Sequence, residues 1–158
     1  GFGGSFGASL DRIGFENFAA SGGTVFRANS SDGWLPAVYG QLELRSGRWL
    51  LEGGLRAERW AVDDERDFGY LAPRFAVKRF LGADVAAKLA AGRYVQYLHS
   101  VRNEELPFGL DIWVTSGDRV PAVVSDQVQA GLESFFADDR WFAMWFVAGA
   151  AGAMTASR

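Results

Sequence analysis

Apolar and polar residues alternate along most of the chain with a period of two. Between residues 49 and 58 one face carries Trp49, Leu51, Gly53, Leu55 and Ala57 and the other carries Glu52, Gly54, Arg56 and Glu58. Consecutive side chains of a strand point to opposite faces, so this segment predicts a strand with one apolar and one charged face. Residues 35–45 alternate in the same way, and the glycine-containing segment 45–48 separates the two. Together they predict a hairpin over about residues 35–60.

The same alternation predicts an all-β, antiparallel meander of about seven long amphipathic strands. They are expected at about residues 2–16, 34–45, 48–61, 70–81, 84–99, 124–136 and 141–150. Most have about 10–14 residues, whereas strands of soluble proteins usually have about five or six and a tilted strand crosses a bilayer with about 9–11. The length of the strands therefore favours a segment of a transmembrane β-barrel over a soluble sandwich.

The expected connections and aromatic residues favour the same architecture. Short turns fall near residues 46, 83 and 138, and long polar segments fall at 17–33, 61–70 and 100–125. Short turns on one side and long loops on the other are typical of outer-membrane barrels. Two aromatic belts are predicted, one beside the short turns and one toward the long loops: Trp49, Phe80, Phe136 and Trp141, then Trp34, Trp60, Tyr70, Tyr94 and Tyr97.

The strand count and the C-terminal residues do not fit a complete single-chain barrel. Bacterial barrels have even numbers of strands, from about eight upward, and an open sheet in lipid leaves unpaired edges. We therefore expect a segment of a larger barrel, or else an eighth strand within residues 17–33 or in the C-terminal part. Residues 141–158 are atypical because 141–154 are apolar on both faces, which fits a buried strand or a short helix.

Composition excludes several other classes of protein. The 158 residues include no cysteine, which excludes disulfides, thiol catalysis and cysteine-based metal sites. The formal net charge of −3 gives no broad basic surface for nucleic acid. The sequence contains no run of about 18 apolar residues, so no transmembrane helix is predicted.

One stretch resembles a known family. The residues Tyr70-Leu71-Ala72-Pro73-Arg74-Phe75 and, after a turn, residues 87–99 (AKLAAGRYVQYLH) are similar to a hairpin of TonB-dependent outer-membrane receptors. Residues 39–42, 54–56, 110–114 and 125–127 are similar to the same family, so that the resemblance covers about residues 34–136. It implies that residues 1–158 are a partial receptor barrel domain, without the plug domain that the family carries.

The resemblance also implies a function for the parent protein. Such receptors lie in the outer membrane of Gram-negative bacteria and import large nutrients, such as siderophores, cobalamin or glycans, with energy passed through TonB. The expected partners are outer-membrane lipid, the plug domain, the remaining strands and, through the parent protein, TonB. A complete small eight-stranded barrel with a structural or adhesion role is the alternative, and an outer-membrane hydrolase is a third hypothesis.

Few residues suggest chemistry, so we expect no enzyme, no cofactor and no metal site. Candidate ligand contacts are His99, Trp113 and Asp111, near the expected loops. His99 and Ser100 are adjacent on a strand and point apart, which argues against a catalytic pair. The acidic residues 63–65 lack the spacing of a calcium loop. The polar face is expected to carry mixed charges that pair or line a solute path: Glu43, Arg45, Glu52, Arg56, Glu58, Arg74, Lys78, Lys88, Gln127, Gln129 and Glu133.

Overall fold

The computed structural model describes residues 1–21, 24–62, 67–102, 111–136 and 141–155. Within these ranges only the backbone is described at residues 18–21, 24–29, 101–102, 111, 135–136, 141–142 and 153–155. The described residues form nine strands: β1 (Phe2–Ser21), β2 (Thr24–Ser46), β3 (Trp49–Val62), β4 (Phe68–Phe80), β5 (Val85–Gln96), β6 (Leu98–Arg102), β7 (Asp111–Thr115), β8 (Ala122–Phe136) and β9 (Trp141–Thr155). Among them no helix is long and apolar enough to cross a membrane.

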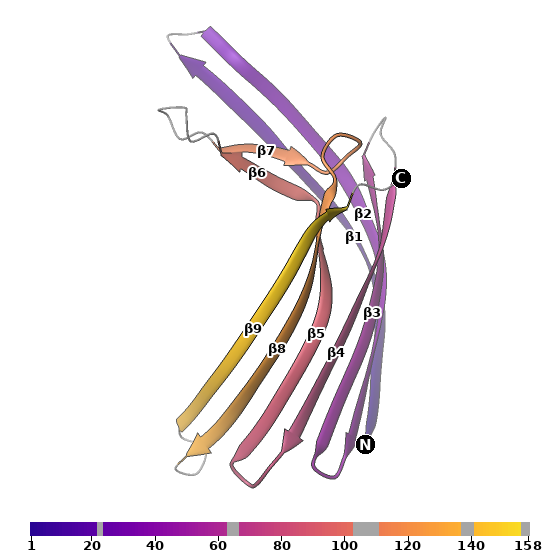
Figure 1. Ribbon diagram of the computed structural model, residues 1–158. Coiled ribbons are helices and arrows are strands. Elements are labelled where there is room, and N and C mark those ends of the chain that lie inside the picture. Colours follow the sequence, from indigo (N-terminus) through magenta and orange to yellow (C-terminus); the bar gives the residue numbers. More distant parts are fainter. Residues whose placement is uncertain (22–23, 63–66, 103–110, 137–140, 156–158) are drawn as a thin grey trace.

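Seven of the strands form one antiparallel meander, in the order β1-β2-β3-β4-β5-β8-β9. The sheet is strongly curved, and β6 and β7 form a separate hairpin at the end opposite the short turns (Figure 1). Within the described residues β1 and β9 do not pair with each other, so the sheet is open at both edges. The predicted all-β meander of seven long strands is confirmed.

Local sequence explains the short turns. Ser46 pairs with Trp49, which leaves a two-residue loop, and Gly47 takes the left-handed conformation (φ 56°) that such hairpin loops require at their first position. At the next turn Leu81 donates from its backbone nitrogen to the carbonyl oxygen of Val85 (2.8 Å). These tight connections fix the register of β2 against β3 and of β4 against β5, and with it the face to which each side chain points.

The structure corrects the predicted long loops. Residues 17–33 are mostly strand, since β1 and β2 continue beyond the other strands as one long ladder (Figure 1). Residues 100–125 contain the β6–β7 hairpin, and the predicted strand 84–99 ends at Gln96. A polar sequence does not exclude a strand in these segments, because hydrogen bonds between paired backbones form whether or not one face of the strand is apolar.

The atypical C-terminal segment is a strand rather than a helix. β9 pairs with β8 from Phe136↔Trp141 to Ala122↔Thr155, so the predicted strand 141–150 is confirmed and extends further. Its apolar character on both faces is real, because Phe146 lies in the row of Lys78 and Lys88 on the polar face of the sheet.

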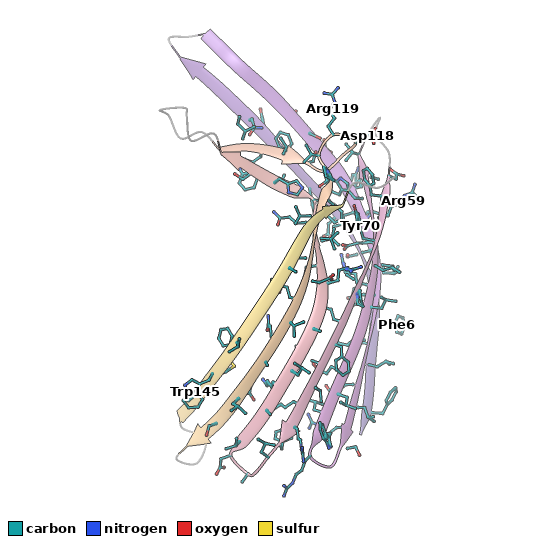
Figure 2. All side chains as sticks on the ribbon, viewed as in Figure 1. Phe6, Arg59, Tyr70, Asp118, Arg119 and Trp145 are labelled. Atoms are coloured by element: carbon teal, nitrogen blue, oxygen red, sulfur yellow. The ribbon has the colours of Figure 1, made fainter. Side chains whose placement is uncertain are left out.

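The register gathers apolar side chains on the convex face. A row, meaning the residues paired directly across the strands, is apolar in all seven strands at Phe2, Leu44, Leu51, Val77, Leu89, Ala130 and Val147. The next row on this face contains Gly4, Leu42, Gly53, Phe75, Ala91, Val128 and Gly149. Many of these side chains are exposed, and Phe6, from the following row, projects outward with 93% of its surface accessible (Figure 2).

Candidate functional site

The concave face of the sheet contains a polar groove of about 530 Å³. Five strands, β2 to β5 and β8, supply its lining, and most of the side chains come from the polar rows of the sheet. All of the charged and amide residues predicted for the polar face lie on this face by register, which confirms that part of the prediction. A groove of this size lies within the range of small-molecule sites, about 300–1,000 Å³.

The central row of the groove alternates long polar side chains with glycine. In order across the strands it contains Gln41, Gly54, Arg74, Gly92 and Gln127. Arg74 therefore has a glycine on each side, and a methyl group at Gly92 would lie 3.3 Å from the Arg74 Cγ and 3.4 Å from the Tyr94 ring. The two glycines keep the space around the guanidinium open.

Arg74 is exposed in the groove and is held by an aromatic ring rather than by a carboxylate. Its guanidinium carbon lies 4.9 Å from the centre of the Tyr94 ring, within the range of cation–π contacts. Among the described residues no carboxylate pairs with it. By contrast, Arg56 in the neighbouring polar row donates from Nε to Glu58 Oε2 at 2.8 Å. Arg74 is thus a cation in the groove that no carboxylate of the described residues pairs with.

A second charged cluster lies below the groove, toward the short turns. Lys78 and Lys88 face each other directly across β4 and β5, which places two like charges side by side. Glu133, only 4% exposed, accepts from the Lys78 ammonium at 2.5 Å and also contacts Lys88. One carboxylate therefore neutralises the repulsion between two lysines, a structural role rather than an open site.

Above the groove, residues 97–102 and 111–116 form a cap. Its base is an aromatic cluster in which Tyr97 stacks on the buried Trp60 of β3, with ring centres 5.0 Å apart. The Tyr97 hydroxyl donates to Glu58 Oε1 (3.0 Å), and Trp60 Nε1 donates to the carbonyl oxygen of Ser116 (2.7 Å). Burial, followed by the nearby Glu58 carboxylate, raises the pKa of Tyr97 above its ordinary range, so the phenol stays protonated. The cap is thereby attached to the inside of β3.

The cap also contacts the extended part of β1 and β2. The Asn17 amide donates from Nδ2 to the carbonyl oxygen of Trp113 (2.7 Å), and the Trp113 backbone nitrogen donates back to Asn17 Oδ1 (3.0 Å). The Ser31 and Thr115 hydroxyls lie 2.9 Å apart. Since the cap is inserted between β5 and β8, these contacts connect it to the other side of the curved sheet.

The three predicted contact residues all belong to the cap, and the register places His99 and Trp113 on opposite faces of its hairpin. His99 is 8% exposed and its Nε2 lies 2.8 Å from Ser116 Oγ, while burial lowers the pKa of His99 below its ordinary value. Trp113 is exposed, and the Asp111 side chain lies outside the described residues. Ser116 is almost fully buried, so its pair with His99 has no access for a substrate and serves to hold the cap.

Sequence alternation placed Arg74 on the polar face but gave no reason to single it out. Its distinguishing features are its two glycine neighbours, which depend on the register of β3, β4 and β5, and the lack of a carboxylate partner among the described residues. Tyr39 and Tyr94, which line the same groove, were missed as contacts. The alternation placed Tyr39 on the polar face of its strand without marking it as a contact, and Tyr94 was assigned to an aromatic belt.

The predicted aromatic belts are only partly supported. Trp34 and Trp49 are exposed, and Trp49 carries Arg79 over its ring at 5.0 Å. Trp60 and Tyr97 are instead buried in the base of the cap. The side chains of Phe136 and Trp141 lie outside the described residues. Aromatic residues near strand ends are thus either exposed on the sheet or buried in the base of the cap. Their positions in the sequence alone do not distinguish the two cases.

Within the described residues no cluster of three or more histidine, cysteine or acidic side chains is suited to hold a metal ion. The acidic segment 63–65 lies outside those residues. Neither a protein-family model nor a curated protein nor a solved structure matches the chain.

Proposed function

We propose that the chain is part of an outer-membrane β-barrel, a receptor of the TonB-dependent kind that takes a large nutrient across the outer membrane. In this proposal the convex face contacts lipid and the concave face lines the lumen. Transport belongs to the parent protein, in which further strands complete the barrel and a plug domain gates it. The cap lies at the mouth of the lumen, on the side of the long β1–β2 hairpin.

The observation that carries the proposal is the apolar convex face. The row that contains Trp49 and the row that contains Ala57 bound this face, with three rows between them. The eight steps along β3 from Trp49 to Ala57 rise about 27 Å along the strand, or about 20 Å along a barrel axis at a tilt of about 40°. That height is close to the apolar band of about 25 Å in outer-membrane barrels. A continuous exposed apolar surface of this extent is typical of a face that contacts lipid or protein rather than water.

One ion pair interrupts the band, one row away from its middle. Arg93 donates from Nε and Nη2 to the two carboxylate oxygens of Asp126, both at 2.8 Å. Asp126 lies two residues before Val128 of the middle row, on the side away from the short turns. A bidentate pair satisfies the hydrogen-bonding groups of both ions, which lowers the cost of placing them within the band.

The open edges support a segment of a larger barrel over a complete small one. An eight-stranded barrel requires one more strand and a last strand paired to the first, and the described strands number seven in an open sheet. In lipid each unpaired backbone group at an edge costs several kcal/mol, so β1 and β9 require partners. The alternative of a small structural or adhesion barrel keeps its place only if an eighth strand joins these two edges.

Arginine substitutions at two neighbouring residues of β8 test the membrane part of the proposal. Val128 lies in the middle row of the convex face and is 54% exposed, whereas Gln129 lines the groove. We expect V128R to lower the free energy of unfolding by about 2–4 kcal/mol in lipid vesicles and Q129R to change it by less than about 1 kcal/mol. Urea titration followed by tryptophan fluorescence measures both.

A convex face in contact with water rather than lipid would give the opposite result. On a sheet surrounded by water, Val128 is an exposed surface residue and its replacement by arginine is nearly neutral, within about 0.5 kcal/mol. Equal, small effects of V128R and Q129R would therefore exclude a lipid-facing convex side. The receptor identity is tested separately by reading the gene beyond both ends of the 158 codons. Further amphipathic hairpins and a preceding globular domain are expected, and their absence would overturn that identity.

A further inference from the structure

We infer that the concave groove binds a sugar acid, with Arg74 as the residue that receives the carboxylate. As a step in nutrient uptake this inference rests on the proposed function, because it names the class of solute that passes along the lumen. As a binding property it depends only on the groove itself. The two are therefore tested by different measurements.

The guanidinium of Arg74 is available for a bidentate contact with a carboxylate. Its planar fork of N–H donors matches the two oxygens of that group, and pairing of this kind adds specificity as well as energy. The ring of Tyr94 holds one side of the guanidinium, and neither neighbour of Arg74 in the row, Gly54 or Gly92, adds a side chain of its own. A ligand thus meets a positioned cation without first having to displace a protein carboxylate.

The two arginines of the groove differ in how they are paired. Arg56 pairs with Glu58 and also donates to Ser9 Oγ at 3.3 Å. The carboxylate of Glu52 lies in the next polar row rather than in that of Arg74, and Lys88 is close enough to interact with it electrostatically. Among the described residues Arg74 is thus the groove cation without a carboxylate partner, which makes it the place where an anionic ligand can bind.

The remaining lining selects a ligand that is rich in hydroxyl groups. Gln41 and Gln127 share the row of Arg74, and Gln129 lies in the next row. Each amide offers both donors and an acceptor, which suits hydroxyl groups better than further anions do. Tyr39 is 43% exposed, and its hydroxyl and ring cover Gly7, where an added methyl group would lie 2.5 Å from the hydroxyl oxygen. Its remaining surface faces the groove as an apolar platform for a sugar ring.

A titration with glucuronate tests the site directly. The whole chain is held in detergent micelles, and binding is followed by isothermal titration calorimetry, with circular dichroism to confirm that each variant retains its strands. We expect glucuronate to bind at least tenfold more tightly than glucose, which lacks the carboxylate, and than acetate, which lacks the hydroxyl groups. Replacement of Arg74 by glutamine should weaken glucuronate at least tenfold.

A matched control lies on the same strand. Arg79 is five residues further along β4, faces the convex side and stacks on Trp49, so R79Q removes an arginine without touching the groove. It should bind glucuronate as the unmodified chain does. If a folded R74Q binds glucuronate normally, or if glucose binds equally well, the inference is wrong. If acetate binds as tightly as glucuronate, the groove is a simple anion site and the sugar-acid assignment is wrong.

The outcomes separate this inference from the proposed function. Failure of the titration with a destabilising V128R would leave a membrane barrel without this solute. Success of the titration with a neutral V128R would leave a sugar-acid site on a sheet that does not face lipid. Tyr94 provides a second variant, because Y94L removes the ring beneath the guanidinium and should weaken glucuronate while leaving the Arg74 charge in place.

Discussion

At the scale of single residues, the stability of the polar face depends on how each charged side chain is paired. Glu133 contacts two lysines and is nearly buried, whereas Glu43 lies 3.8 Å from Arg45 at an exposed position. Exposed ion pairs contribute little, because water screens them and the side chains lose freedom. A carboxylate that separates two facing lysines contributes much more, since its loss leaves like charges without compensation.

Replacement of Glu133 by glutamine should therefore destabilise the sheet. We expect E133Q to lower the free energy of unfolding by about 2 kcal/mol, less than a fully buried pair would, because Lys88 is partly exposed. E43Q makes the same chemical change on the same face and should cost less than about 0.5 kcal/mol. Urea titration of both variants in detergent provides the measurement, and equal values for the two would show that the lysine pair needs no carboxylate.

At the scale of elements, the sequence predicted the strands far better than the cap. Alternation placed β3, β4 and β8 within two residues of their observed ends. This succeeds because one face of each strand is apolar and the other polar, a signal carried by adjacent residues. The cap carries no such local signal, because His99 and Ser116 are 17 residues apart and Trp60 meets Ser116 from 56 residues away. Contacts between residues so far apart in the sequence can be predicted only when the register of the whole sheet is known.

The cap should loosen in acid. Its buried His99 has a lowered pKa, so the folded cap favours the neutral ring and the unfolded cap binds the proton more readily. The contribution of this residue is then fully present above a pH of about 6.5, the ordinary histidine value, and declines as the pH falls below it. Amide hydrogen exchange of Trp113 and Ser116, corrected for the intrinsic effect of pH, should reveal more frequent opening at pH 5 than at pH 7.5.

A glutamine at position 99 separates titration from simple acid unfolding. H99Q keeps a polar group beside Ser116 but does not titrate, so its corrected exchange should be the same at both pH values. If H99Q loosens in acid as much as the unmodified chain does, another group is responsible. Tyr97, whose hydroxyl donates to Glu58, has a raised pKa and stays protonated throughout this range.

At the scale of the whole molecule, the main feature is the difference between the apolar and the polar face of the sheet. The seven-strand count, the meander order and the separation of apolar from polar rows follow from the alternation seen in the sequence. The extension of β1 and β2 and the continuation of the apolar β9 to Thr155 do not, because those residues lack the alternation from which a strand is predicted. The groove is also a feature of the whole molecule, because five strands line it.

The most direct test of the account measures which face meets lipid. Because the chain has no cysteine, a single spin label can be attached at each of residues 87–92 of β5 in turn. In lipid vesicles, labels at Ala87, Leu89 and Ala91 should be accessible to oxygen, which concentrates in the bilayer, and protected from a water-soluble nickel complex. Labels at Lys88, Ala90 and Gly92 should show the reverse, with a period of two. Equal access of the nickel complex to both sets would contradict the account.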